Sequence, residues 1–345
     1  MPWSIKLSAL IACVGALHAG PVEFGLAEFD AAASAKKLNW KVNTNLTVDP
    51  PETFLIEPYP AGGARVSGGD LRGLMYGLLE AAAQIRATGK LTAAHNGPAA
   101  KLRAVRIALD AADLTKSWFA SDLFWRAYFQ TLARSRLNRL ELAAPRLDSL
   151  PAIARRLAPI AAEYGVDFIA GLPPLSGDAG QIRVALSTAL SAAPVLRGLE
   201  LEAEGASADL YRAALLPALR QAGRRVTLDL HGGANRLELV QAAIDAGVPL
   251  QVSGDVPCDD HLLHLTESFC GAGYGFDYTL HVRAPVPSQP ADVRVVLASL
   301  SASGGAGFEL DIPASHLGGE AGAWAFESHS EFYRTWGALG YDPRR

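Results

Sequence analysis

Short segments typical of β-strands recur along most of the chain at intervals of about thirty residues. They begin near residues 105, 137, 166, 198, 226, 248, 276 and 307, so that successive starts lie 22 to 32 residues apart. The stretches between them carry helix signals, with a capping residue and an early proline at Ser149-Leu-Pro and a capping-box pattern at Asn235 and Glu238. About thirty residues is the length of a strand with its crossover helix. The repeat therefore predicts an α/β fold, a (β/α)8 TIM barrel over residues 103–345.

An open doubly wound sheet is the alternative fold for alternating strands and helices. Such sheets usually have about five or six strands, and a glycine-rich phosphate turn follows the first one. No glycine-rich turn follows the first segment here, which ends at Asp110. The sequence therefore favours the closed barrel.

Residues 20–90 predict a small α+β domain in front of the barrel. Apolar residues have helical spacing in residues 24–38 and again in residues 71–87, where Asp70 is a suitable N-cap. Strand-like runs lie at residues 46–48 and 53–57 and within the segment GGARVSGGD. Residues 91–102 are polar, contain Gly and Pro and show no periodicity, so we expect them to form a linker.

The first nineteen residues have the pattern of a secretory signal peptide. Lys6 precedes an apolar run over residues 7–17, and small residues follow. The run is too short to cross a membrane, and a buried N-terminal strand or helix is the alternative. The pattern predicts a secreted or periplasmic protein, in which Cys258 and Cys270 either form a disulfide or stay as buried thiols.

The composition excludes several classes of partner. Half of the 345 residues are hydrophobic, which is typical of a packed globular protein, and the formal net charge is −4. No Lys- or Arg-rich run offers a surface for nucleic acid or for anionic membranes. No Cys-x-x-Cys pair is present, which excludes a structural zinc site of that kind. We expect no cofactor, and the oligomeric state stays open.

The predicted strands carry many charged residues on one of their two sides. In the fourth strand Leu199 and Leu201 must face the helices, so Glu202 and Glu204 point into the barrel. The same alternation, together with the strand ends, selects Asp110, Asp229, His231, Asp255, Asp277, His281, Arg283, Glu309 and Asp311. Active sites of this fold lie at the carboxyl ends of the strands, so these residues predict a polar ligand-binding mouth. The alternative is a structural ion network with Arg106, Arg139 or Arg283.

Aromatic residues also lie near the predicted mouth. Trp118 follows the first strand, and Trp324 lies in the longest barrel loop, residues 315–328. Their flat rings suit the apolar C–H faces of sugars. Alternatively, Trp324 and Phe326 close the barrel against the last helix.

The stretch RVSGGDLRGLMYGLLEAAAQIR, residues 65–86, resembles the N-terminal domain of family 20 β-hexosaminidases and family 67 α-glucuronidases. Arg72, Gly73, Tyr76 and Gly77 carry that match, while Asn138-Arg139 and the closing WGALGYDP extend it across the barrel. The resemblance implies a carbohydrate-active barrel. Family 20 enzymes have an adjacent Asp-Glu pair after the fourth strand, whereas this chain reads Glu202-Ala203-Glu204-Gly205, so their mechanism does not transfer.

Three function classes follow. The first is a secreted glycoside hydrolase with Glu204 as the acid and Asp277, Glu309 or Asp311 as its ionised partner; the remaining mouth residues would bind the substrate. The second is a carbohydrate-binding barrel without catalysis, which the missing Asp-Glu pair favours. The third is a metal-dependent barrel hydrolase or isomerase, although no His-x-His or His-x-x-x-His spacing supports it. Its oxygen and imidazole ligands would come from Glu204, Asp229, His231, Asp255, His281 and Asp311.

Overall fold

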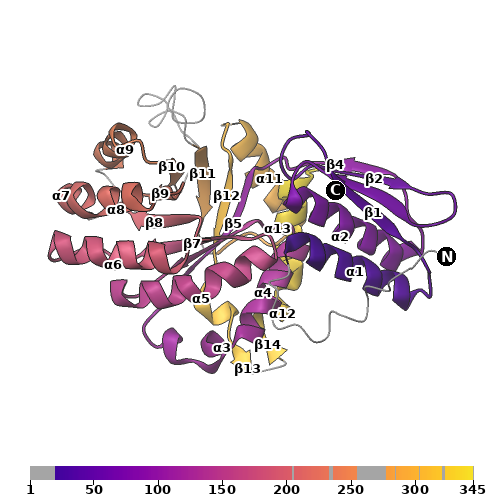
Figure 1. Ribbon diagram of the computed structural model, residues 1–345, viewed down its shortest axis with the longest axis horizontal. Coiled ribbons are helices and arrows are strands. Elements are labelled where there is room, and N and C mark those ends of the chain that lie inside the picture. The colour runs from indigo at the N-terminus through magenta and orange to yellow at the C-terminus, as the bar shows by residue number, and fades with distance from the viewer. Residues whose placement is uncertain are drawn as a thin grey trace, which may run out of the picture.

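The computed structural model describes residues 20–203, 206–232, 236–254, 277–283, 285–302, 304–320 and 323–344. An N-terminal unit and a barrel lie side by side, and the C-terminal helix α13 (Ser330–Tyr341) lies where they meet (Figure 1). No helix in these ranges is long and apolar enough to cross a membrane. The fold is the predicted α/β arrangement, a (β/α)8 barrel preceded by a small α+β unit.

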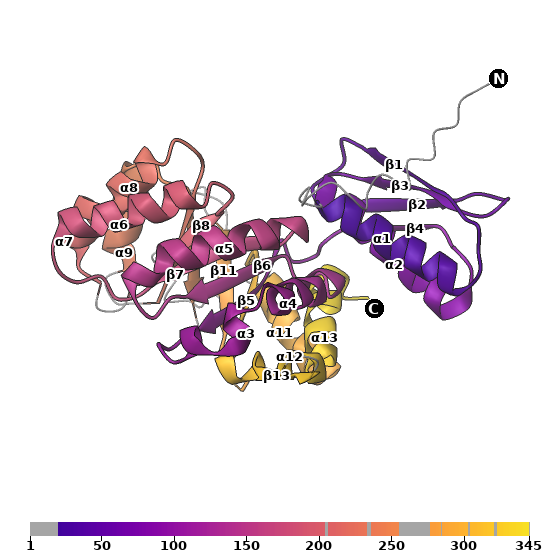
Figure 2. The ribbon, with the colours of Figure 1, turned by 60° about the horizontal axis from the view of Figure 1, so that its bottom comes forward.

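The N-terminal unit is a four-stranded sheet with two helices on one face (Figure 2). Its strands lie in the order β1 (Val42–Leu46), β3 (Ala64–Gly68), β2 (Phe54–Pro58) and β4 (Ala94–Asn96), and its helices are α1 (Pro21–Ala35) and α2 (Leu71–Thr88). As expected, Asp70 caps α2, because its Oδ1 accepts a hydrogen bond from the Gly73 N–H at 2.6 Å. Gly89, with φ of 67°, ends the helix.

Strand β4 lies inside the segment expected to be a linker. It pairs antiparallel with β2, with Ala94 opposite Ile56 and Asn96 opposite Phe54. Because it is a three-residue edge strand whose side chains are half-buried or exposed, it has no alternation of apolar residues that sequence reasoning could detect.

The eight-stranded parallel barrel is closed, as predicted. Its strands are β5 (Leu102–Ala108), β6 (Arg139–Ala143), β7 (Asp167–Leu172), β8 (Gly198–Glu202), β9 (Thr227–His231), β10 (Leu250–Gly254), β11 (Asp277–Val282) and β12 (Gly307–Asp311). The helices around it include α3 (Ser117–Ala120), α4 (Asp122–Arg134), α5 (Leu150–Glu163), α6 (Ala179–Ala192), α7 (Ala208–Leu210), α8 (Leu216–Gln221), α9 (Arg236–Asp245) and α11 (Pro290–Ala302). After β12 come β13 (Gly319–Glu320), β14 (Ala323–Trp324) and α12 (Ala325–Ser328).

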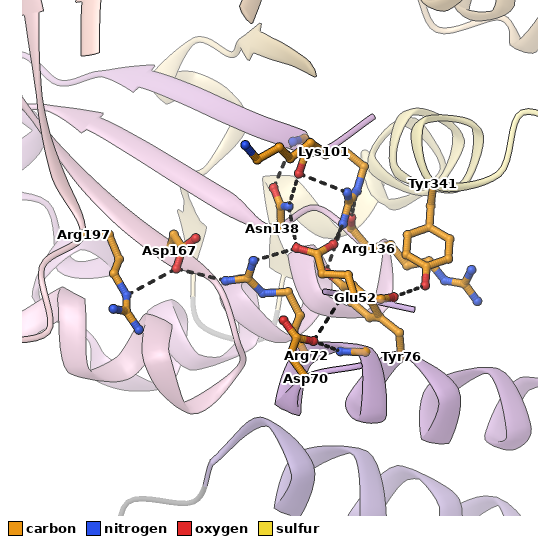
Figure 3. A network of polar contacts seen from close by, with 12 residues as sticks. Glu52, Asp70, Arg72, Tyr76, Lys101, Arg136, Asn138, Asp167, Arg197 and Tyr341 are labelled. Atoms are coloured by element: carbon orange, nitrogen blue, oxygen red, sulfur yellow. Dashed lines mark hydrogen bonds and ion pairs between the residues drawn. The ribbon is translucent and has the colours of Figure 1, made fainter. Parts of the chain in front are cut away.

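The two units are joined by a buried polar network around Glu52 (Figure 3). The Glu52 carboxylate pairs with Arg103 at the start of the barrel and accepts hydrogen bonds from Arg72 Nη1 at 2.7 Å and Asn138 Nδ2 at 2.9 Å. The Tyr341 hydroxyl donates to the Glu52 carbonyl oxygen. Arg72, Asn138 and Tyr341 belong to the segments that carry the family resemblance, and here they fix the N-terminal unit to the barrel.

Candidate active site

Carboxylates from two other barrel strands, β8 and β12, meet around one guanidinium, that of Arg106 on β5. Arg106 Nε donates to Glu200 Oε1 at 2.6 Å, while its terminal nitrogens lie 3.7 Å from Glu202 Oε2 and 3.6 Å from Asp311 Oδ1. Glu200 is buried, whereas the side chains of Glu202 and Asp311 are 34% and 33% exposed. Two partly exposed carboxylates from different strands therefore both lie close to the Arg106 guanidinium.

Two histidines complete a ring between these carboxylates. His231 Nδ1 lies 3.2 Å from Glu202 Oε2, and His231 Nε2 lies 2.6 Å from His281 Nδ1, a distance at which one imidazole donates to the other. His281 Nε2 lies 3.9 Å from Asp311 Oδ2. We call the closed set Arg106, Glu202, His231, His281 and Asp311 the mouth ring. Adjacent strands β8 and β9 supply one half, and adjacent β11, β12 and β5 supply the other.

The ring sets the charge of its members. Burial raises the pKa of Glu202, but the hydrogen bond to His231 and the charge of Arg106 outweigh it, so that pKa lies below its usual range. Burial lowers the pKa of His231, but the hydrogen bond to Glu202 and its negative charge outweigh burial, so that the pKa of His231 is raised. Glu202 is therefore held as the anion at neutral pH, beside an imidazole that is ready to carry a proton.

A second, buried layer of polar residues lies below the ring. It contains Arg139, Glu141, Glu200, Asp229, Gln251, Ser253, Thr279 and Glu309, all of them 9% exposed or less. Desolvation and the neighbouring carboxylate Glu141 raise the pKa of Glu309 well above its usual range, and Asp229 is shifted upward for the same reasons. In most TIM barrels branched apolar residues fill this space. Here charged and polar side chains occupy much of this space, with Ala104 and Ile169 among them.

A cavity of about 380 Å³ adjoins the mouth ring at Asp311. Its lining includes Phe332 and the imidazoles of His316 and His329, which stack with their ring centroids 4.3 Å apart. This volume is within the range of small-ligand pockets. Asp311 thus belongs both to the ring and to a space that a ligand of sugar size can enter.

The structure brings together some of the sequence-predicted site residues. Glu202, His231, His281 and Asp311 meet in the mouth ring, and Asp229 and Glu309 lie in the layer below it. Arg283 follows β11 and acts electrostatically on Glu202. Glu204 and Asp255 lie outside the described residues, as do Cys258, Cys270 and the proposed signal peptide.

Other predicted site residues lie elsewhere. Asp277 is the first residue of β11, and its carboxylate lies 2.6 Å from Lys101 Nζ, just before β5, so it is at the amino-terminal base of the barrel. The alternation of side chains along β11 correctly predicted that Asp277 faces inward, but the prediction that it lies at the mouth of the barrel is wrong. Asp110 lies beyond β5, where its Oδ1 accepts a hydrogen bond from the Asp113 N–H at 2.7 Å and stabilises a turn.

Trp118 and Trp324 belong to an aromatic cluster, not to a sugar platform. Both are buried, and both pack on Phe124 of α4, with ring centroids 5.0 and 5.5 Å away. Phe326 continues the cluster toward Tyr128, which contacts Tyr333 of α13. The rings therefore close the barrel against its helices, which was the alternative interpretation of Trp324 and Phe326.

Sequence reasoning missed three kinds of lumen residue. Arg106 was treated as a possible ion partner, but it is the centre of the mouth ring. Glu141 was not selected, although the alternation Leu140-Glu141-Leu142 in β6 carries the same signal as that of β8. Gln251 and Ser253 of β10 also face inward, and their uncharged side chains gave no reason to single them out.

The comparisons with known proteins show the fold. No family model and no curated protein sequence matches the chain. Among solved structures, a family 138 glycoside hydrolase targeting pectin rhamnogalacturonan II is similar over 93% of this chain and 49% of its own, with a TM-score of 0.76 and 14% identity. A family 115 4-O-methyl-α-glucuronidase with specificity for decorated arabinogalactans covers 96% of this chain and 56% of its own (TM-score 0.55, 14% identity). A family 20 β-N-acetylglucosaminidase covers 90% and 86% (TM-score 0.57, 12% identity).

The chain thus spans about half the length of the first two of these enzymes. At 10–14% identity, such likeness shows the fold alone, a (β/α)8 barrel with a preceding unit arranged as in these enzymes. This agrees with the architecture that the N-terminal resemblance implied.

Proposed function

We propose that the chain is an exported glycoside hydrolase that cleaves O-glycosidic bonds in plant cell-wall or amino-sugar polysaccharides. The observation that carries the proposal is the mouth ring, in which Glu202 and Asp311 are partly exposed on either side of Arg106 beside a ligand-sized cavity. The polymer classes are those on which the structural neighbours act.

Three residues have roles in this proposal. Of the three partners considered for Glu204, Asp277 lies at the base and Glu309 is fully buried, so Asp311 is the one at the mouth. Glu204, two residues beyond the end of β8, supplies the proton to the leaving oxygen, and Asp311 acts as the ionised base or nucleophile. Glu202, held as an anion by His231, stabilises the positive charge that develops on the sugar ring.

The test is turnover of a substrate panel by the full chain. The panel contains rhamnogalacturonan II, decorated arabinogalactan and aryl glycosides of glucuronic acid and N-acetylglucosamine. On any substrate that responds, Glu204→Gln and Asp311→Asn should each reduce kcat by about 10²-fold or more. Glu57→Gln, an exposed carboxylate on β2, is the matched control and should leave kcat unchanged. Unchanged turnover in Glu204→Gln would remove Glu204 from the mechanism.

Carbohydrate binding without catalysis is the second candidate. Arg106 contacts Glu200, Glu202 and Asp311 together, which is the ion network expected of a structural role. Saturable binding of a panel polysaccharide without any release of reducing sugar would favour this function over hydrolysis.

Export is proposed from the first nineteen residues. Expression of the full chain in a bacterial host should yield a periplasmic protein whose N-terminus begins after Ala16 or Ala19. A cytoplasmic protein that keeps Met1 would contradict export without affecting the catalytic proposal.

A further inference from the structure

Three carboxylates converge in the lumen below the mouth ring. Glu141 of β6, Asp229 of β9 and Glu309 of β12 come from strands spread around the barrel, yet each offers an oxygen within 4.8 Å of the other two. Their exposures are 0%, 1% and 0%. We call these three residues the lumen triad. Like charges at such separations repel strongly where water does not screen them.

The positive charge near the lumen triad is insufficient to balance it. Arg139 Nη1 lies 3.4 Å from Glu141 Oε1 and 3.6 Å from Asp229 Oδ2, so its guanidinium pairs with two members of the triad. Arg106 acts electrostatically on the third, Glu309, but it is shared with Glu200, Glu202 and Asp311. Asp229 also accepts hydrogen bonds from Ser253 Oγ at 3.0 Å and from Gln251. If all three carboxyls are ionised, their pairing with Arg139 leaves a net charge of about −2 in a buried space, which is costly unless protons or a cation compensate it.

Glu309 points into the triad, where its carboxyl group meets that of Glu141. Within the described part of the chain, no N–H or O–H group donates a hydrogen bond to either Glu309 oxygen or to Glu141 Oε2. Buried carboxylate oxygens normally accept hydrogen bonds or coordinate a metal. In a cation site, buried acceptor oxygens from several carboxylates face one another around the ion, and the oxygens of the lumen triad have this arrangement.

We propose that the lumen triad binds one hard divalent cation, Ca²⁺, Mg²⁺ or Mn²⁺. Carboxylate oxygens are the ligands that these ions prefer. An ion of charge +2 would neutralise the negative charge of the triad that Arg139 does not balance. The site is separate from the proposed catalytic residues Glu204 and Asp311, and its role is to hold β6, β9 and β12 together across the lumen. It shares only Asp229 with the metal site considered from the sequence.

The first experiment measures metal in the purified full chain after dialysis against metal-free buffer. We expect about one equivalent of one of these ions, and a melting temperature that falls by several degrees in EDTA and recovers when that ion is restored. Less than a tenth of an equivalent, before and after loading with each of the three ions, would overturn the proposal.

Variants separate a bound cation from the competing explanation, in which protons neutralise the triad. Glu309→Gln and Asp229→Asn should lose the metal and the response of the melting temperature to EDTA. The matched control Glu163→Gln, a buried carboxylate that pairs with Arg126 on the outer helices, should keep both. If protons hold the triad instead, Glu309→Gln leaves the melting temperature unchanged or raises it, and no metal is found. Should Glu309→Gln fail to fold, the metal content of the unmodified chain decides alone.

Discussion

Replacing Glu52 by Gln removes the negative charge at the junction between the N-terminal unit and the barrel. Arg103 is fully buried, and its guanidinium pairs with that carboxylate; Arg72 contacts the same group at 2.7 Å. The amide of Gln can still accept one hydrogen bond, but it leaves the Arg103 charge without its counter-ion in a buried site. Breaking a buried pair in this way costs about 3–5 kcal/mol.

The titration of Glu52 gives an independent magnitude. Burial raises its pKa, but the charges of Arg103 and Arg72 outweigh burial and lower it from 4.5 to about 2. At about 1.4 kcal/mol per pH unit, the ionised form contributes about 3 kcal/mol to the free energy of unfolding. Since the pKa is lower in the folded state, this contribution is complete above pH 4.5 and is lost as the pH falls from 4.5 toward 2.

Urea unfolding at pH 7, followed by circular dichroism and tryptophan fluorescence, measures the effect. Glu52→Gln should lower the free energy of unfolding by about 3 kcal/mol or more. The difference in free energy of unfolding between the variant and the unmodified chain should become smaller below pH 4.5. The control is Glu57→Gln in the neighbouring strand β2. The Glu57 side chain is about half exposed, so this change should alter the free energy of unfolding by less than about 0.5 kcal/mol. A loss below about 1 kcal/mol in Glu52→Gln, or a gap independent of pH, would refute the reasoning.

Two further predictions concern packing. Gly337→Ala should lower the free energy of unfolding by at least about 1–3 kcal/mol, because a Cβ there would lie 1.7 Å from the carbonyl oxygen of Ser135. If the variant and the unmodified chain unfold at the same urea concentration, α13 can shift without cost and the prediction is wrong. Phe124→Ala should cost about 3–5 kcal/mol and weaken the near-ultraviolet signal of its neighbours Trp118, Trp125 and Trp324, since the ring is fully buried among them. An unchanged near-ultraviolet spectrum would contradict the cluster.

The barrel could be predicted from the sequence because its signal is local. Each strand needs only alternating or apolar residues over five to seven positions, and the recurrence near thirty residues supplies the topology. Which side of a strand faces inward was also predictable, since Leu199 and Leu201 allow only one choice. Strand β4 was missed because a short edge strand buries too little to impose a pattern.

The depth of a residue in the lumen could not be predicted in this way. Asp277, Glu309 and Asp311 all face inward, yet they lie at the base, in the buried layer and at the mouth respectively. Depth depends on the stagger between strands, which is set by pairing partners far away in sequence. The partners of Arg106 were hidden for the same reason, because Glu200 and Asp311 lie 94 and 205 positions further along the chain.

The buried layer and the mouth are built on the same strands, so each constrains the other. Asp229 and His231 are alternate residues of β9, and Glu309 and Asp311 are alternate residues of β12. A step of two residues along a strand is about 6.6 Å, so a shift of β9 or β12 at the lumen triad also shifts the mouth residue of that strand. Loss of the proposed cation is therefore expected to displace His231 and Asp311 as well. For this reason we expect the lumen triad to matter for the geometry of the mouth, although none of its side chains is exposed there.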